Sequence, residues 1–195
     1  MMKKKLLAPI IILVLVILYS TVTYNSIIKK EEKVKQDWSE MQNTYQRRLD
    51  LIPNLVSVVK GVSEFEKTVL QQVAEARSNA SRVFSPEEIT KENFETQKRL
   101  QDSLVARVNR MILLIEAYPE LRATQAYLAL QKQLEGTERR IVVARKDFNE
   151  SVFNYNKTVK AFPANLVAGI AGFKPKQGFE SVEGADQPAE IKFNQ

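Results

Sequence analysis

Residues 127–162 read YLALQKQLEGTERRIVVARKDFNESVFNYNKTVKAF, and this stretch decides the fold of the chain. Steps of three and four residues connect a series of mostly apolar or small side chains, called the seam here: Tyr127, Leu130, Leu134, Thr137, Ile141, Ala144, Phe148, Ser151, Tyr155, Thr158 and Phe162. This spacing places them on one side of an α-helix, while Lys, Arg, Glu, Gln and Asn occupy the outward positions. The seam therefore predicts one helix, roughly 50–55 Å long, packed against other helices along its whole length.

The composition favours helices and excludes several kinds of active site. The chain has 195 residues, of which 44% are hydrophobic, and this is enough for one domain with a core. Only six glycines occur, and four of them follow Pro163, so the earlier part has almost no turn residues. There is no cysteine and no histidine. Cys or His nucleophiles, His bases and the usual zinc sites are therefore excluded, and we expect no metal and no cofactor.

The positive charge has an ordinary explanation. The formal net charge is +6, but the lysines and arginines are interleaved with Glu and Asp. This pattern is typical of solvated helix faces, and no cluster of aromatic and basic residues of the RNA-binding type is present. We expect neither a nucleic acid nor a small-molecule substrate as a partner.

Residues 1–24 are predicted to be a transmembrane anchor. Lys3, Lys4 and Lys5 precede an uncharged run of about 19 residues that ends at Tyr24, close to the ~20 residues that cross a bilayer. A cleaved signal peptide is the alternative, but no small-x-small cleavage site and no lipobox cysteine follow the run. Lysines flank both ends of the run, and its lysine-rich start favours a bulk domain outside the cytoplasm.

Four helices are expected over residues 25–162. Nothing breaks the helical pattern between Tyr24 and Tyr45, so the anchor and the first helix are predicted to form one rod. A tight hairpin is expected near residues 47–54, because Pro53 disfavours helix at the preceding residue and suits the start of a new one. The hairpin residues are Arg47, Arg48, Asp50, Pro53 and Asn54. Asp50 is a plausible cap, and we favour a role for the charged residues in pinning the turn over ligand binding.

The remaining helices follow from their start signals. The second helix is expected from Pro53 to Ala80. Ser85, Pro86 and Glu88 form a capping-box pattern that begins the third helix, and Pro119 begins the fourth, which carries the seam. The predicted fold class is therefore all-α: an N-terminal transmembrane helix followed by an antiparallel four-helix bundle with long helices.

The chain changes character after Phe162. Residues 163–173 are apolar and small, and residues 174–195 are rich in Pro, Gly and charge, as in a flexible tail. If the four helices alternate in direction, the fourth one ends at the membrane. The segment Leu166 to Phe173 is too short to span a bilayer, so we expect it at the lipid interface or against the base of the bundle.

Three residues of the fourth helix stand out. Gly136 costs about 1 kcal/mol relative to Ala inside a helix, and we expect either a close approach of a neighbouring helix or of the hairpin there, or a tolerated exposed glycine. Asn149 and Asn156 are seven residues apart and share one face. Polar groups beside a seam can fix register and partner choice, and ordinary surface placement is the alternative. Acidic pairs on one helix, such as Glu135 with Glu138, are interpreted as surface charges.

Several ordered strings resemble the LemA family of bacterial membrane proteins. They are Arg47–Val56, Lys60-Gly61, Glu75-Ala76-Arg77, Glu116–Leu121, Leu134–Glu138, Ile141, Ala144-Arg145, Phe148-Asn149, Tyr155-Asn156 and Phe162-Pro163. The match covers about residues 24–180, and Leu49 departs from it where many members carry an aromatic residue. The resemblance implies an N-terminal membrane helix followed by a helical bundle, and it provides no established enzymatic activity to carry over to this chain. A relative in magnetosome-forming bacteria is associated with building that membrane compartment.

Two functions are compared on this basis. The first is a single-pass protein of the bacterial inner membrane with a structural or membrane-organising role, partnered by the lipid bilayer and by further copies of itself as a scaffold. Part of the seam is expected to extend beyond its intrachain partners and to form the oligomer interface. The alternative is an adaptor or regulatory subunit bound to a membrane protease or an envelope signalling system. An enzyme is not expected, because no pairing of nucleophile and base is visible.

Overall fold

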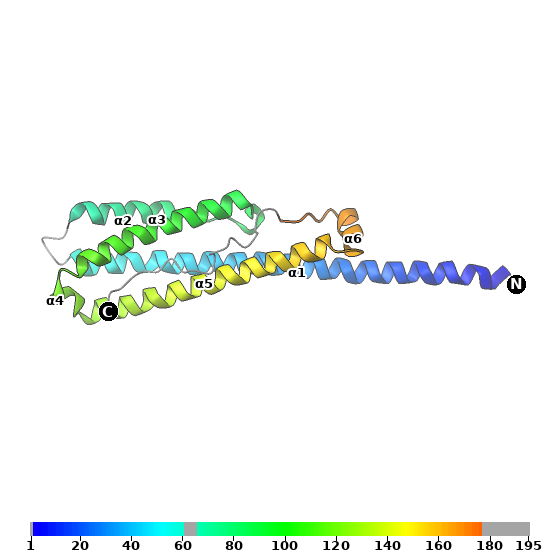
Figure 1. Ribbon diagram of the computed structural model, residues 1–195, viewed down its shortest axis with the longest axis horizontal. Helices are drawn as coiled ribbons and strands as arrows, with labels where there is room; N and C mark the ends of the chain where they lie inside the picture. The colour runs from blue at the N-terminus through cyan, green and yellow to red at the C-terminus, as the bar shows by residue number, and fades with distance from the viewer. Residues whose placement is uncertain (1, 61–65, 177–195) are drawn as a thin grey trace.

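The structure is a computed structural model and describes residues 2–60 and 66–176 (Figure 1). Within these ranges every regular element is helical, which confirms the all-α prediction. The elements are α1 (Met2–Lys60), α2 (Lys67–Ala80), η1 (Pro86–Glu88), α3 (Lys91–Ile115), α4 (Pro119–Arg122), α5 (Gln125–Lys160) and α6 (Ala164–Ala171). The flexible tail predicted for residues 174–195 lies outside the described residues from 177 onward, as does part of the predicted second helix, residues 61–65.

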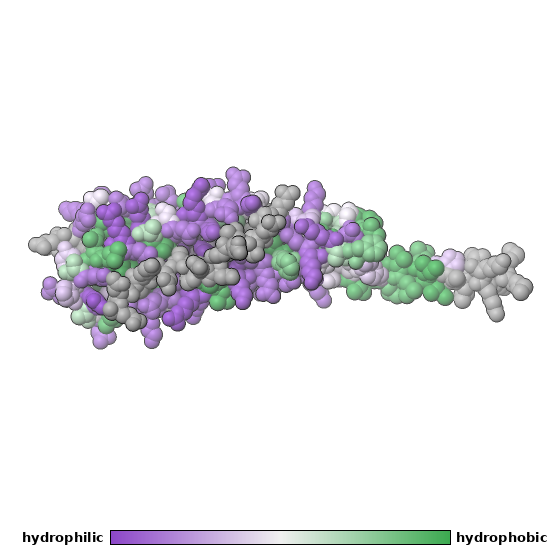
Figure 2. Space-filling model, in the orientation of Figure 1, coloured by the Kyte–Doolittle hydropathy of each residue, from purple (hydrophilic) through white to green (hydrophobic). Residues whose placement is uncertain are grey.

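Helix α1 connects the apolar end of the chain to the far end of the molecule. It has 59 residues, so it is about 90 Å long. Its first part projects beyond the other helices, and the side chains from Ile10 to Leu18 are about half exposed or more (Figures 1 and 2). In the described part of the chain, α1 is the one helix long and apolar enough to cross a membrane. The predicted continuous rod is confirmed.

The predicted hairpin at residues 47–54 is wrong, because α1 continues through Pro53 to Lys60. A proline inside a helix leaves the carbonyl four residues earlier without its N–H donor. That carbonyl belongs to Leu49, and it accepts a hydrogen bond of 2.8 Å from Nε of Arg77 on α2. Since Pro53 is also exposed to solvent, the helix tolerates it. The predicted second helix accordingly begins at Lys67 and not at Pro53.

Helix α5 runs antiparallel to α1 along its whole length (Figure 1). The seam is buried from Tyr127 through Tyr155, Thr158 is half-buried, and Phe162 is 81% exposed. The expectation that part of the seam would lack intrachain partners is therefore wrong for all but its last residue. Helix α1 covers the seam because about 36 of its residues extend past the apolar run, more than a helix that ends at the predicted hairpin would provide.

Helices α2 and α3 pack on each other and cover the far part of the α1–α5 pair (Figure 1). The capping box of Ser85 and Glu88 is present, but it begins only the short turn η1. Helix α3 begins at Lys91, and the side chain of Thr90 caps it by accepting a hydrogen bond from the Asn93 backbone N–H. Helix α5 begins at Gln125, and the side chain of Thr124 caps it by accepting from the Tyr127 backbone N–H. Pro119 begins only the four-residue helix α4. Nearest the anchor, only α1, α5 and α6 remain side by side (Figure 1).

The core of the molecule is divided into two clusters. The distal core, far from the anchor, joins all four long helices: Leu49, Leu51, Ile52, Leu55, Val59, Val69, Val73, Ala76, Ala80, Leu104, Val105, Val108, Met111, Ile112, Ile115, Leu121, Tyr127, Leu130 and Leu134. The proximal core is built mainly by α1 and α5: Ile27, Val34, Trp38, Met41, Tyr45, Phe84, Ile141, Ala144, Phe148, Val152, Tyr155, Val159 and Ala168. A layer of polar side chains lies between these two clusters.

Candidate functional site

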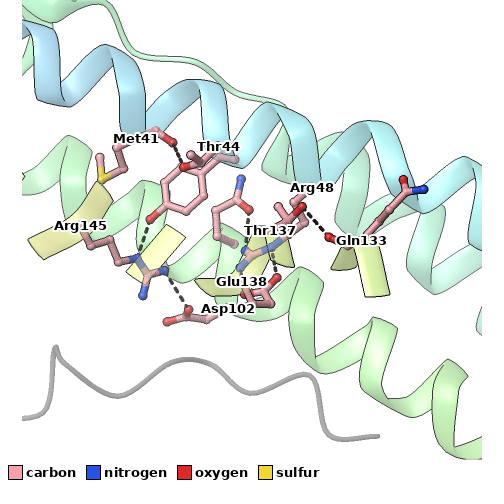
Figure 3. Close-up of polar contacts among 10 residues, drawn as sticks. Met41, Thr44, Arg48, Asp102, Gln133, Thr137, Glu138 and Arg145 are labelled. Atoms are coloured by element: carbon pink, nitrogen blue, oxygen red, sulfur yellow. Dashed lines mark hydrogen bonds and ion pairs between the residues drawn. The ribbon is translucent and has the colours of Figure 1, made fainter. Parts of the chain in front are cut away.

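The polar layer is centred on Arg48, whose side chain is only 1% exposed. Nε of Arg48 donates to Oε1 of Glu138 at 2.7 Å, and its Nη2 pairs with Oε2 of the same carboxylate (Figure 3). Its Nη1 donates to Oε1 of Gln101 at 2.9 Å. Gln101 in turn donates to the carbonyl oxygen of Ala80 at 3.2 Å. One arginine thus connects α1, α5 and α3, and Gln101 extends the connection to the end of α2.

A second buried arginine lies beside the first. Nε of Arg145 on α5 donates to the Tyr45 hydroxyl at 2.8 Å, and its Nη2 lies 3.6 Å from Oδ1 of Asp102 on α3. The guanidinium groups of Arg48 and Arg145 lie 5.8 and 5.6 Å from the centre of the Tyr45 ring, which is favourable for a cation. Burial by itself lowers the pKa of Arg145, but the Tyr45 hydroxyl, Asp102 and Glu138 outweigh this effect and raise the pKa.

This geometry supports alignment of helices more than chemistry. Both oxygens of Glu138 are engaged by Arg48, so neither is directed toward a substrate. A buried ion pair adds little net stability compared with apolar side chains, but losing one partner is costly. The bidentate pair therefore favours one register of α1 against α5. Among the described residues, no group of three or more His, Cys, Asp and Glu side chains is arranged to hold a metal ion.

A shallow groove follows the outer side of the α1–α5 pair. Its polar part is lined by Lys30, Lys33, Asp37, Asp147, Glu150, Ser151 and Asn154. Oδ1 of the buried Asp37 lies 2.7 Å from Nζ of Lys33, and this hydrogen bond raises the pKa of Lys33. The neighbouring hollow is lined by Glu40, Thr44, Arg139, Arg140, Val143, Ala144 and Asp147. Exposed Val143 gives this part of the surface an apolar patch.

The five residues expected to form the hairpin are separated by their positions around α1. Arg48 points into the core, whereas Arg47, Asp50, Pro53 and Asn54 are exposed. Asp50 does not cap a helix, and its Oδ1 accepts a hydrogen bond of 2.8 Å from Gln46 one turn earlier. The expected pinning of a turn by the charged residues is therefore wrong.

Gly136 does not mark a close approach between helices. It is exposed on α5, and a Cβ atom added to it would meet nothing within 4 Å. The alternative of a tolerated exposed glycine agrees with the structure. Asn149, also on α5, is half-buried.

Asn156 binds the backbone of a segment that follows α6. Its side chain accepts from the Lys176 N–H at 2.8 Å and donates to the Lys176 carbonyl at 2.9 Å. The Tyr155 hydroxyl donates to the Lys174 carbonyl at 3.1 Å, and Nζ of Lys176 lies 3.4 Å from Oε1 of Glu31 on α1. Residues 173–176, called the strap here, are thus attached to both long helices. Burial, followed by the charge of Glu31, raises the pKa of Tyr155 to about 12.

The two remaining predicted residues lie at the anchor side of the bundle. Leu166 is 58% exposed on α6. The ring of Phe173 packs against that of Tyr24, with 5.6 Å between ring centres.

Sequence reasoning missed most of the polar layer, including Tyr45, Gln101, Asp102, Glu138 and Arg145. One pattern would have pointed to it. Arg48 interrupts the apolar series of α1, and Glu138 directly follows Thr137 of the seam, so opposite charges occupy inward positions on two neighbouring helices.

Comparison with known proteins identifies the family. Magnetosome protein MamQ 2 of Paramagnetospirillum magneticum and magnetosome protein MamQ of Magnetospirillum gryphiswaldense are each 23% identical over 184 residues, covering 85% of this chain and 67% of theirs. Protein LemA of Metamycoplasma hominis is 22% identical over 144 residues, covering 74% of this chain and 63% of its own length. The sequence profile of the LemA family matches residues 37–193, and the chain therefore belongs to the LemA family.

Proposed function

We propose that this protein is a single-pass membrane protein with a structural role and no catalytic activity. The observation that carries the proposal is the continuity of α1, which passes from an exposed apolar segment into the core of the bundle without a break. A bilayer would cover the exposed segment, and α5 packs along the rest of the helix. The protein then holds a stiff helical body directly next to the membrane.

The body would act as an antiparallel four-helix bundle with a coiled-coil-like seam. Support comes from the alternating directions of α1, α2, α3 and α5 and from the buried positions of the seam. The polar layer would keep α1 and α5 in register while the distal surfaces contact other proteins. We place the protein in the bacterial inner membrane, with the bulk of the chain outside the cytoplasm.

The process that we favour is organisation of the membrane, with the protein acting as a self-assembling scaffold. Two relatives carry the name magnetosome protein, and this is the reason for preferring a membrane process. Since α1 covers the seam, self-association would use outer surfaces instead. Val143 and Phe153 of α5 are exposed by 56% and 63% and offer apolar contacts there. The alternative, an adaptor of a membrane protease or an envelope signalling system, would use the same surfaces.

Photocrosslinking in native membranes tests this proposal. A photoreactive amino acid replaces Val143 or Phe153 in the full-length protein, and exposed Lys146 serves as the polar control position on the same helix. We expect crosslinks between copies of the chain from the apolar positions and fewer from the control. Mass spectrometry identifies the crosslinked species.

The other outcomes separate the hypotheses. A single stoichiometric partner of another sequence would favour the adaptor. Monomer alone at both apolar positions would contradict self-assembly. A C-terminal alkaline phosphatase fusion that is inactive would contradict placement of the body outside the cytoplasm.

A further inference from the structure

Helix α6 presents an apolar stripe to the outside at the level where α1 leaves the bundle. Leu166 and Ile170 are four residues apart on α6, so they share one face, and they are 58% and 91% exposed. Phe162, which precedes Pro163 at the start of α6, is 81% exposed and is counted with them as the stripe. Ala164 and Ala168 on the opposite face are buried. From Ala161 to Phe173 no side chain is charged, and Asn165 alone carries a polar group. Exposure of this kind would be unfavourable in water.

The position of α6 relative to the apolar run sets its depth. The run from Leu6 to Tyr24 is roughly 28 Å long as a helix, close to the ~30 Å of a bilayer core. Its last turn therefore lies where hydrocarbon meets headgroups. The residues of α1 that face α6 lie in or next to this turn, because Ser20, Thr21 and Tyr24 line a shallow hollow together with Val167, Ile170 and Ala171. The stripe of α6 thus lies beside the edge of the hydrocarbon layer.

Helix α6 is held in place at both ends. It follows α5 after only Ala161, Phe162 and Pro163, and it ends at Gly172, whose φ of +81° suits glycine and turns the chain back. Phe173 then packs on Tyr24, and the rest of the strap is bonded to Tyr155 and Asn156. The stripe is therefore a fixed surface, so little ordering is needed when it binds.

Positive charges surround the stripe on the side of the bundle. Lys29, Lys157, Lys160 and Lys174 are exposed. They lie near one level, because Lys30 of α1 bonds to Thr158 of α5 and Lys176 of the strap to Glu31. The acidic side chains at this level, Glu31 and Glu32, pair with Lys176 and Lys35. An apolar stripe bordered by lysines fits a bilayer that contains anionic lipids.

We propose that α6 is a second membrane contact: Phe162, Leu166 and Ile170 insert at the interface of the bilayer that α1 crosses, and the exposed lysines meet anionic phospholipid headgroups. This inference rests on the membrane anchoring proposed above. One transmembrane helix leaves the body free to tilt toward any of its faces. A second contact on one side of α1 favours tilting toward that side.

Spin-label accessibility tests the proposal in the full-length protein. Since the chain has no cysteine, Ile170→Cys provides a single labelling site. The protein is reconstituted into vesicles of phosphatidylcholine and phosphatidylglycerol, and collisions of the label with oxygen and with a water-soluble nickel complex are compared. Leu15→Cys is the control inside the anchor, and Lys146→Cys is the control on the exposed polar face of α5, well above the membrane. All three positions are exposed.

We expect the label at Ile170 to collide severalfold more with oxygen than with nickel, as at Leu15, and the label at Lys146 to show the reverse. A label at Ile170 that behaves as at Lys146 would overturn the inference, while lipid exposure at Leu15 would leave the anchor intact. If Leu15 is also open to nickel, the proposed anchoring itself fails. A third outcome is protection of the label from both reagents, together with spectral broadening that disappears when unlabelled protein is added. This result would overturn the lipid contact and show that the stripe binds a second copy of the chain.

The contribution of the lysines and the anionic lipids is tested separately. In vesicles of phosphatidylcholine alone, or with Lys157→Gln and Lys160→Gln together, the label at Ile170 should become more accessible to nickel. Equal accessibility under all three conditions would contradict the role of the lysines.

Discussion

The distal and proximal cores bury their helices with different kinds of side chain. In the distal core four helices meet, and among its buried members Tyr127 is the one aromatic residue. In the proximal core two long helices do most of the packing, and five aromatic residues fill the space: Trp38, Tyr45, Phe84, Phe148 and Tyr155. Two helices leave their shared seam open at the sides. Large rings close it, because each aromatic side chain buries about 150–250 Å².

A loop residue completes the proximal core. The ring centres of Trp38 and Phe148 are 5.2 Å apart, and Nε1 of Trp38 donates to the carbonyl of Phe84 at 2.9 Å. Phe84 comes from the connection between α2 and η1 and is itself buried. In the proximal half, the aromatic side chains and the loop that carries Phe84 cover the sides of the α1–α5 pair. In the distal half, α2 and α3 cover them.

The largest effect is expected from removing an aromatic side chain from the proximal core. Phe148→Ala should lower the free energy of unfolding by about 4 kcal/mol, and Leu104→Ala in the distal core by about 3 kcal/mol. Four surrounding helices can close in on a lost leucine better than two can on a lost ring. Denaturant unfolding of the full-length protein in detergent, followed by circular dichroism, measures both. A larger loss for Leu104→Ala would break the comparison.

The boundary between the two cores is tested at the polar layer. Glu138→Gln leaves the buried Arg48 without its counter-charge and should cost about 3 kcal/mol. The double variant Arg48→Met with Glu138→Leu removes both charges and should cost clearly less. Glu150→Gln on the exposed face of α5 is the matched control and should change the same unfolding measurement by less than about 0.5 kcal/mol. A double variant that is less stable than Glu138→Gln would contradict the argument.

The continuity of α1 in the distal half depends on Arg77. Arg77→Met leaves the Leu49 carbonyl without a donor at Pro53, and the expected cost is about 2 kcal/mol. Hydrogen exchange should become faster in residues 49–60 and remain unchanged in the proximal core. Pro53→Ala in the Arg77→Met background restores an N–H for that carbonyl and should recover part of the stability. Absence of any recovery would mean that Arg77 acts in another way.

Alkaline pH should weaken the two halves unequally. The folded state holds the pKa of Tyr155 at about 12, above its ordinary value near 10. Its contribution is fully present below pH 10 and is lost as pH rises toward 12, because the unfolded chain releases the proton first. Burial also raises the pKa of Tyr127 in the distal core. In denaturant titrations across this pH range, Tyr155→Phe should reduce the pH-dependent decrease in the free energy of unfolding more than Tyr127→Phe does. An equal reduction in both variants would contradict a larger role for Tyr155.

The smallest effect is expected at Gly136, on α5 near the polar layer. Gly136→Ala should stabilise the helix by up to about 1 kcal/mol, since the added methyl meets nothing within 4 Å. Gly172→Ala is the contrasting change, because its positive φ disfavours Ala and should make it destabilising. Thermal unfolding shows whether each substitution raises or lowers the stability. A loss of stability for Gly136→Ala would restore the idea of a close approach.

The long helices were predictable because their pattern is local. The seam of α5 repeats over many turns, and nearly all of its expected members are buried. The continuous rod of α1 was predictable as far as Tyr45 for the same reason. Pro53 misled the prediction because a proline signals the start of a helix in local terms. The bond that keeps α1 intact comes from Arg77 on α2, 28 residues further along the chain, and no local pattern reveals it.

The polar layer and the strap could not be predicted from local sequence patterns, because their contacts join residues far apart in the chain. Glu138 looked like a surface charge because it was compared with Glu135 on its own helix, whereas its partner Arg48 lies 90 residues earlier. The role of Asn156 depends on where the chain returns after α6. The apolar character of residues 163–173 was visible in the sequence, but its placement beside Tyr24 required the structure.

The unbroken course of α1 also makes the protein a lever. The 36 residues from 25 to 60 extend roughly 54 Å beyond the apolar run as one continuous helix. A tilt of about 10° where α1 leaves the bilayer would displace its far end by roughly 9 Å. If α1 crosses the bilayer as proposed, a small change of its tilt in the membrane would therefore become a large displacement of the α3–α4–α5 end.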